Sequence, residues 1–286
     1  MFHLRNSLLS NKFFFISIIS FITLFILSFY PVWKNLIFSW YNNEDFSHGF
    51  AIIPLTSYII WRKRYTFDLS GNKHAVTSLF GLVICIVSLL LYFLSFLGEV
   101  KTLSSISMLF FVAGSIIYTL GFSFFKSIIF PFALLFLMIP IPSQILALLT
   151  IPLQFIVTNI AGYISRSINI PLYIQGNLIH IPNHTFEVVQ ACSGLRSIMT
   201  LVTLGAYLGY FMLSSSFQRF LLILSSLPIA IATNALRIIC IVALAYYFQL
   251  DLMHGPIHTL FGIIIFILSL CSFLLIQKGL SIWLTK

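Results

Sequence analysis

The sequence predicts an all-α polytopic membrane protein with about eight transmembrane helices, one interfacial or re-entrant helix and a short outer β-hairpin-like segment. Of its 286 residues, 60% are hydrophobic and only 7% are charged, and the mean hydropathy is +1.07. Apolar runs recur from end to end, and so few charges cannot cover a water-soluble surface. A soluble enzyme, a disordered chain and a disulfide scaffold are therefore excluded. The net charge of +9 contains no basic cluster beyond residues 62–64, so it does not indicate nucleic-acid binding.

The predicted spans follow the apolar runs in chain order, because a helix needs about 20 residues to cross the hydrocarbon. We expect the first run to be a retained anchor, since it lacks a small-residue cleavage site. No internal repeat or linker is visible, so residues 1–286 are expected to form a single integral-membrane domain. The expected spans cover residues 13–30, 48–61, 77–97, 103–121, 126–140, 194–213, 220–248 and 259–277.

Residues 143–165 are apolar enough to cross, but a crossing there would reverse every later loop. Without it, most of the 15 Lys and Arg lie on the side of the N-terminus, as the positive-inside rule requires. We therefore expect both termini in the cytoplasm and an interfacial or re-entrant helix at 143–165, with Pro140, Pro142 and Pro152 at breaks. Beyond it, Gly176-Asn177 between apolar residues predicts an outer β-hairpin.

Three polar residues are expected to meet at the outer edge of the membrane. Cys192 stands in a polar stretch just before a span, whereas the other three cysteines lie within apolar runs. Arg237 follows Arg219 by a helical rise of about 27 Å, which brings it near the outer edge. An arginine within a span costs about 2.5–3.5 kcal/mol, which favours a functional role. His258 immediately precedes the last span.

A thiol, a guanidinium and an imidazole at one level support acyl transfer. Cys192 is the expected nucleophile, and His258 takes its proton and returns it to the leaving amine. Arg237 stabilises the oxyanion, and the helix that begins near Gly194 adds its positive end. The product is a thioester that water or another nucleophile opens. We expect no metal and no cofactor, because the His and Glu residues at 180–187 stand without a second cluster at zinc spacing.

Four further residues are candidates for substrate binding or support. His48 lies in an outer Ser-His-Gly segment. Arg196 follows the cysteine by one turn, where it would hold a substrate carboxylate or lower the pKa of the thiol. Asn234 precedes the arginine by one turn and would orient its guanidinium. His254 is a weaker candidate, because Gly255-Pro256 predicts a new helix between it and the histidine at the span.

Five segments carry a family resemblance when they are taken in order. They are DFSHGFAIIPLTSYIIWRKR at 45–64, MIPIPSQILALLTIPLQFIVTNIAGYISRSINIPLYIQGNLI at 138–179, EVVQACSGLRS at 187–197, NALRI at 234–238 and HTLFG at 258–262. Over residues 40–277 the chain resembles the exosortase and archaeosortase family of membrane cysteine transpeptidases. The family's proposed catalytic cysteine, arginine and histidine correspond to Cys192, Arg237 and His258, and a histidine at the third position is similar to the bacterial exosortase branch.

The resemblance implies a cysteine peptidase of the bacterial inner membrane that cuts secreted proteins at its outer face. The implied substrates carry a C-terminal PEP-CTERM-type sorting signal, which joins a Pro-Glu-Pro-type motif, a transmembrane helix and a basic tail. The implied acceptor of the new C-terminus is an extracellular polysaccharide or a lipid. The residues alone leave three alternatives: a transporter or channel, a polysaccharide-export subunit without peptidase activity, and an acyltransferase that uses the same thiol on a lipid.

Overall fold

The computed structural model describes residue 16 and residues 19–64, 75–182, 184–189, 193–249 and 256–283, without the side chains of 75–77, 256–259 and 283. Within these residues the chain is mostly helical, which confirms the predicted class. Six helices are long and apolar enough to cross a membrane, or seven if a bent pair counts as one span. Of the eight predicted spans, two fall on helices that are too short, since α3 (Gly49–Arg62) has 14 residues and α6 (Phe122–Leu134) has 13. The helix over Ser143–Ser167, which was not among the eight, is long enough to cross.

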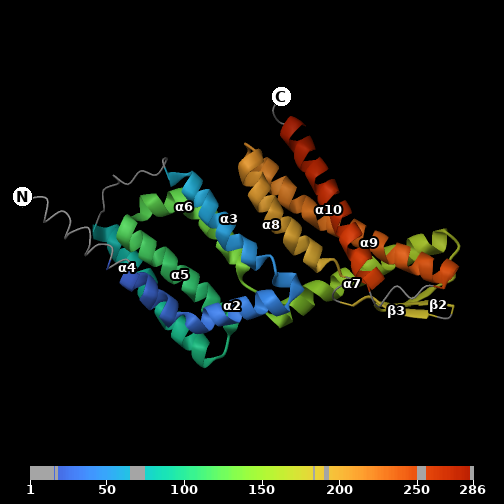
Figure 1. Cartoon of the computed structure of the whole chain (residues 1–286), viewed down its shortest axis with the longest axis horizontal. Helices are drawn as coiled ribbons and strands as arrows, with labels where there is room; N and C mark the ends of the chain where they lie inside the picture. The colour runs from blue at the N-terminus through green and yellow to red at the C-terminus, as the bar shows by residue number, and fades with distance from the viewer. Residues whose placement is uncertain are drawn as a thin grey trace, which may run out of the picture. The chain divides into compact units, whose positions relative to one another are not determined.

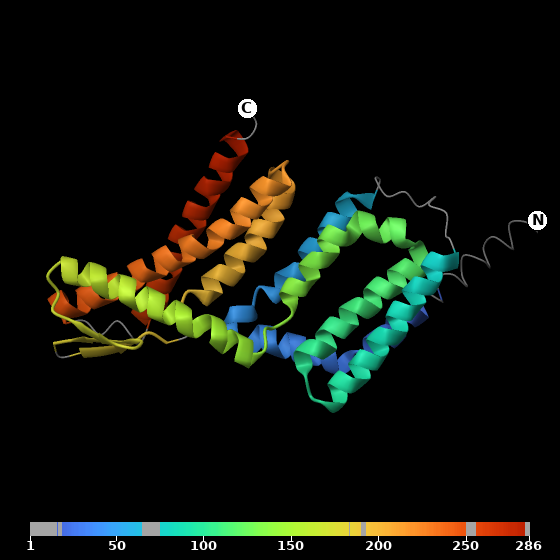
Figure 2. The same ribbon diagram turned by 180° about the vertical axis from the view of Figure 1, so that it is seen from behind.

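The chain divides into two compact units, of which the first comprises residues 1–43 and 49–140. Besides α3 and α6, the described part of this unit contains α2 (Tyr30–Asn42), α4 (Ala75–Leu97), α5 (Lys101–Leu120) and a short 3-10 helix, η3 (Leu135–Met138). Helices α4 and α5 lie side by side (Figures 1 and 2).

Glycine allows the close approach of α4 and α5. A Cβ added to Gly114 of α5 would lie 2.8 Å from the Sγ of Cys85 and 2.9 Å from the backbone oxygen of Gly81, both on α4. Small residues at such crossings let helix backbones approach in a membrane, where packing drives association. The pair is therefore held by backbone proximity along a narrow seam.

The predicted first span ends in a sharp bend. The helix Ile19–Ser28 meets α2 at an angle of 67°, and Phe29 at the bend is 1% exposed. Pro31 occupies the first turn of α2, where its missing N–H would have no helical partner in any case. The apolar run therefore continues past residue 30 as a second helix in a new direction.

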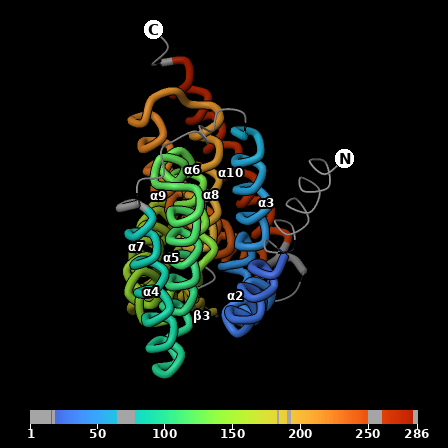
Figure 3. The backbone as a smooth tube through the Cα atoms, turned by 90° about the vertical axis from the view of Figure 1, so that its left-hand side faces the viewer, coloured from blue at the N-terminus to red at the C-terminus, as the bar shows by residue number. Residues whose placement is uncertain are grey.

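The second unit comprises residues 44–48 and 141–286. Its described elements are the 3-10 helix η1 (Glu44–Phe46), α7 (Ser143–Ser167), β1 (Tyr173–Gln175), β2 (Leu178–Ile181), β3 (His184–Glu187), α8 (Leu195–Met212), α9 (Ser216–Phe248) and α10 (Pro256–Trp283). In Figures 1 and 2, α7 runs across the direction of α8 and α10, and Figure 3 shows the same chain turned by 90°.

The three strands form an antiparallel sheet in the order β1-β2-β3. Gly176 has a φ of 64° in the turn between β1 and β2, so the predicted hairpin is confirmed and a third strand extends it. Ile179 of β2 pairs with Ile174 and Phe186. The buried face of the sheet packs against α7 and α9 in one core, which comprises Val157, Ala161, Ile170, Ile179, Ile181, Phe186, Val188, Ala235, Ile238, Ile241, Val242 and Ala245.

Helix α7 is continuous over 25 residues and is long and apolar enough to cross a membrane. A re-entrant hairpin at 143–165 is therefore wrong. The predicted break at Pro152 is also wrong, because this proline lies inside the helix, where it removes only its own N–H from the hydrogen-bond ladder. Pro142 is the N-cap of α7, so the helix begins directly after the proline pair.

Helix α9 is anchored at its start and along its length. Ser215 and Gln218 form a capping box, with the serine Oγ accepting from the backbone N–H of Phe217 at 3.2 Å. The side-chain amide of Gln218 donates to the backbone oxygen of Leu280 on α10 at 3.0 Å. The bond to Leu280 fixes the level of α9 relative to α10, on which the site below depends.

Candidate active site

The turn before α8 packs directly on α9. Gly194 is the N-cap of α8 and has a φ of 85° and a ψ of −1°, a conformation that favours glycine. Ser193 is fully buried, and its Oγ accepts from the backbone N–H of Leu195 at 3.3 Å. A Cβ added to Gly194 would lie 3.4 Å from both the backbone oxygen of Ala230 and the Cβ of Asn234. Residues 193–194 therefore touch α9 at the level of the predicted arginine motif.

Arg237 lies one turn beyond this contact and faces α10. It is half-buried, and a Cβ added to Gly262 of α10 would lie 3.5 Å from its Nη2 and 3.8 Å from its Cζ. The guanidinium thus lies over the backbone of α10 at a glycine, where no side chain displaces it. Close by, the hydroxyl of Ser269 on α10 donates to the Oγ1 of Thr233 at 2.7 Å and links the two helices.

The structure describes only part of the set formed by the predicted nucleophile and the two predicted histidines near α10. Cys192 lies outside the described residues, two positions before Gly194. The backbone of His258 is described in the first turn of α10, one turn before Gly262, but its side chain is not. His254 lies outside the described residues. The helix begins at Pro256, as the sequence predicts.

The start of α8 also holds the Glu44–His48 segment. The guanidinium of Arg196 pairs with the carboxylate of Glu44 through Nη1, and its Nε donates to the Oδ1 of Asp45 at 3.4 Å. Asp45 is buried, whereas Glu44 is exposed. His48 is half-buried in the same segment. The prediction that Arg196 binds a substrate carboxylate stays a prediction, and in the structure two protein carboxylates occupy its guanidinium.

Asn234 is 5% exposed and touches the turn at Gly194. Its predicted role in orienting the guanidinium of Arg237 is consistent with its place one turn earlier on α9, and it also links α8 to that helix. Sequence reasoning missed two features of this region: Asp45 as a partner of Arg196, and Gly262 as the seat of the guanidinium. The signals were an acidic pair before the Ser-His-Gly segment and a glycine one turn after the predicted histidine.

The histidines of the sheet have local partners. The ring of His180 stacks on Tyr173 with centroids 4.2 Å apart, and its Nδ1 lies 3.0 Å from the Oγ1 of Thr185. Glu187 accepts from Asn177 at 3.4 Å. Among the described residues, no group of three or more His, Cys, Asp or Glu is placed to hold a metal ion.

In this helical membrane protein, Gly194 of the cysteine motif and Gly262 of the histidine motif both contact α9, which carries the arginine motif. This arrangement defines a class of candidate membrane acyl-transfer enzymes. The family model described as transmembrane exosortase (EpsH) matches residues 40–275. The chain therefore belongs to the transmembrane exosortase family and is a multi-pass membrane protein. Membership implies a membrane protein-sorting transpeptidase, because the exosortases are a membrane peptidase family. Comparisons with curated proteins and with solved structures give no match.

Proposed function

We propose that this exosortase is a cysteine transpeptidase that cleaves PEP-CTERM-type sorting signals of secreted proteins through a thioester at Cys192. The observation that carries the proposal is the meeting of the three motifs on α9. Gly194, two residues after the cysteine, touches Asn234, and Gly262, one turn after the histidine, touches Arg237. These contacts support a site that would contain a nucleophile, a cation and a base.

Each group then has a distinct task in the reaction. The Cys192 thiolate attacks the scissile carbonyl, and the guanidinium of Arg237 stabilises the charge that develops on its oxygen. His258 accepts the thiol proton and gives it to the nitrogen of the scissile bond, so this nitrogen leaves as a neutral amine. The acyl group remains on sulfur until an acceptor nucleophile, or water, attacks the thioester and restores the thiol.

Half-burial of Arg237 suits this role. A guanidinium screened from water interacts more strongly with a developing charge than an exposed one does. Its seat over Gly262 fixes the planar group without a competing side chain, and a fixed fork of donors needs no reorganisation as the charge forms. Helix α8 begins at Leu195 and directs its positive end toward the residues that precede it.

We further propose that the site faces the outer side of the inner membrane and that both termini are cytoplasmic. The distribution of Lys and Arg supports this orientation. It requires α7 to lie along the outer interface, which its course across α8 and α10 favours (Figures 1 and 2). The substrate's sorting signal would then reach the site from the outer leaflet.

The proposal is tested by co-expressing the chain with a secreted reporter that ends in a Pro-Glu-Pro-type motif, an apolar helix and a basic tail. Cys192→Ala and Cys192→Ser should each abolish processing, which is measured as the loss of the shorter product on a gel and by mass spectrometry of its C-terminus. Cys271→Ala, at an exposed thiol of α10, is the matched control and should process normally. Normal processing by both Cys192 variants would contradict the assignment of the nucleophile.

A further inference from the structure

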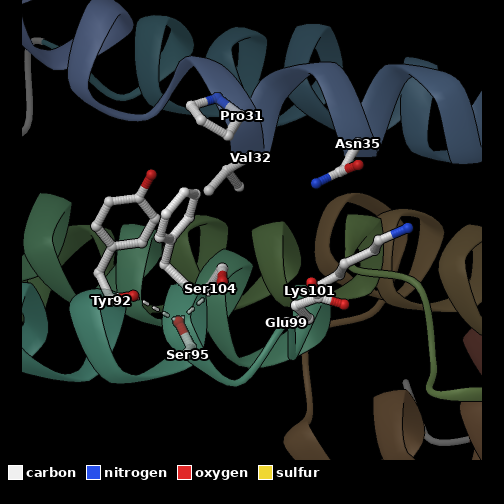
Figure 4. A pocket seen from close by; sticks show the side chains of 9 residues that line it. Pro31, Val32, Asn35, Tyr92, Ser95, Glu99, Lys101 and Ser104 are labelled. Carbon is white, nitrogen blue, oxygen red and sulfur yellow. Dashed lines mark hydrogen bonds between the residues drawn. The ribbon is translucent and has the colours of Figure 1, made fainter.

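The first unit contains a cavity of about 170 Å³ between α2 and the turn that joins α4 to α5 (Figure 4). Asn35 lines it from α2, and Glu99 and Lys101 line it from the turn. Within the described part of the chain, these three side chains make no hydrogen bond or ion pair. The hydroxyls of Ser95 and Ser104 lie 2.8 Å apart and are already bonded to each other. The Lys101 ammonium, the Glu99 carboxylate and the Asn35 amide therefore line the same cavity.

The position of the cavity along the two helices indicates its level in the membrane. The turn at 98–100 joins two helices that are long and apolar enough to span, Ser78–Leu97 and Lys101–Leu120. Such a turn lies at the surface of the bilayer, at the level of lipid headgroups. From there an apolar strip leads back along α4, because Phe93, Phe96 and Leu97 are 60%, 57% and 64% exposed. Phe96 itself lines the cavity. Headgroup and acyl chain would therefore both find matching surfaces.

The charges select the headgroup. The Lys101 ammonium attracts a phosphate, and the Glu99 carboxylate attracts an ammonium. A simple anion would be repelled by Glu99, and one carboxylate is too few for a divalent cation, which takes about six oxygen ligands. A cavity of about 150 Å³ holds a benzene molecule, so this volume suits a compact group and not a peptide segment. A small zwitterion fits both the charge and the size.

We propose that this cavity binds the phosphoethanolamine headgroup of a membrane lipid, with Lys101 on the phosphate and Glu99 on the primary ammonium. Asn35 adds an amide from the opposite wall (Figure 4). The site lies in the first unit and does not depend on the peptidase proposed above. It gives the turn between α4 and α5 a lipid partner at the membrane surface.

The backbone at Glu99 makes a sharp test available. Glu99 has a φ of 54°, in the left-handed region that favours glycine. Glu99→Gly therefore removes the carboxylate while it relaxes the backbone, so a lost preference between lipids in this variant cannot be ascribed to backbone strain. Lys126→Gln is the charge-matched control for Lys101→Gln, because Lys126 is also exposed and lies on α6, outside the cavity lining.

The experiment titrates dihexanoyl phosphatidylethanolamine and dihexanoyl phosphatidylcholine into the full-length protein in detergent and measures bound lipid by native mass spectrometry. The wild type should bind the ethanolamine lipid about tenfold more tightly, because a quaternary ammonium offers no N–H donor to the carboxylate. Glu99→Gly should bring the two affinities together. Lys101→Gln should weaken both lipids, and Lys126→Gln should leave both unchanged.

Equal binding of the two lipids by the wild type would overturn the proposal, as would an unchanged preference in Glu99→Gly. Equal effects of Lys101→Gln and Lys126→Gln would also overturn it, because the phosphate would then bind elsewhere. Glycerophosphoethanolamine, which has the headgroup without acyl chains, distinguishes the source of the ligand. It should bind much more weakly than the lipid, and equal affinity would assign the cavity to a soluble compound and refute the lipid.

Discussion

Replacing Arg196 with Gln should release the Glu44–His48 segment from the start of α8. The guanidinium of Arg196 pairs with Glu44 and Asp45, and the bond to Asp45 joins residues 151 positions apart. The glutamine keeps a hydrogen-bonding side chain of smaller reach but removes the charge. Because these bonds join one short segment to a single turn of α8, we expect local opening and not global unfolding.

The size of the effect follows from the exposure of the three side chains. The Arg196 side chain is 44% exposed and that of Glu44 is 74% exposed, so this pair contributes less than about 1 kcal/mol. The Asp45 side chain is only 9% exposed, and breaking a buried charge pair costs up to about 3–5 kcal/mol, a ceiling that any other partner of the carboxylate lowers. Water around the arginine reduces that cost. We expect about 2 kcal/mol in total, which corresponds to roughly 30-fold in an opening equilibrium.

Hydrogen–deuterium exchange of the peptide that covers residues 44–48 measures this opening directly. In Arg196→Gln its amides should exchange roughly 30-fold faster, with exchange in α5 unchanged. Arg219→Gln is the matched control, because its guanidinium donates to the backbone oxygen of Leu213 at the other end of α8. Unaltered exchange at 44–48 in Arg196→Gln would refute the reasoning, and so would an equal acceleration in Arg219→Gln.

Two further predictions concern the membrane core and the orientation. Gly114→Ala should lower the free energy of unfolding by about 1–3 kcal/mol, because its Cβ would press within 2.9 Å of the α4 backbone. Thermal unfolding in detergent checks this against Gly279→Ala, whose Cβ meets nothing within 4 Å, and equal melting temperatures would contradict it. A reporter fused after Lys286 should be cytoplasmic and one inserted at Asn183 should be outside; the reverse result would refute the proposed topology.

Hydropathy predicted those features of the fold that depend on local sequence. In a membrane protein, long apolar runs indicate helices. Gly176 indicated the hairpin because a tight turn needs a residue in the left-handed conformation at that position. The third strand was not predicted, because the polar residues His184 and Thr185 interrupt the apolar alternation. The break predicted at Pro152 was wrong because local rules treat a proline as the end of a helix. Helix α7 has enough other hydrogen bonds to continue through this residue.

Sequence reasoning named residues for the candidate site but not the contacts that they make. The cost of placing Arg237 within a span singled it out from sequence alone. The ion pairs of Arg196 could not be predicted from the sequence. Asp45 is 151 positions away, and no local pattern indicates which of the chain's cations this carboxylate contacts. The seat of Arg237 over Gly262 likewise depends on the packing of α9 against α10, which hydropathy does not specify.

The glycines of the cysteine and histidine motifs are explained by contact with α9, without any appeal to reactivity. A side chain at Gly194 would press on Asn234 and strain a backbone with φ of 85°, and so would move the turn that follows Cys192. Bulk beyond a methyl group at Gly262 would displace the guanidinium of Arg237 from α10. Each glycine therefore sets the distance of one motif from α9, and α9 is the common reference against which the start of α8 and the start of α10 are positioned.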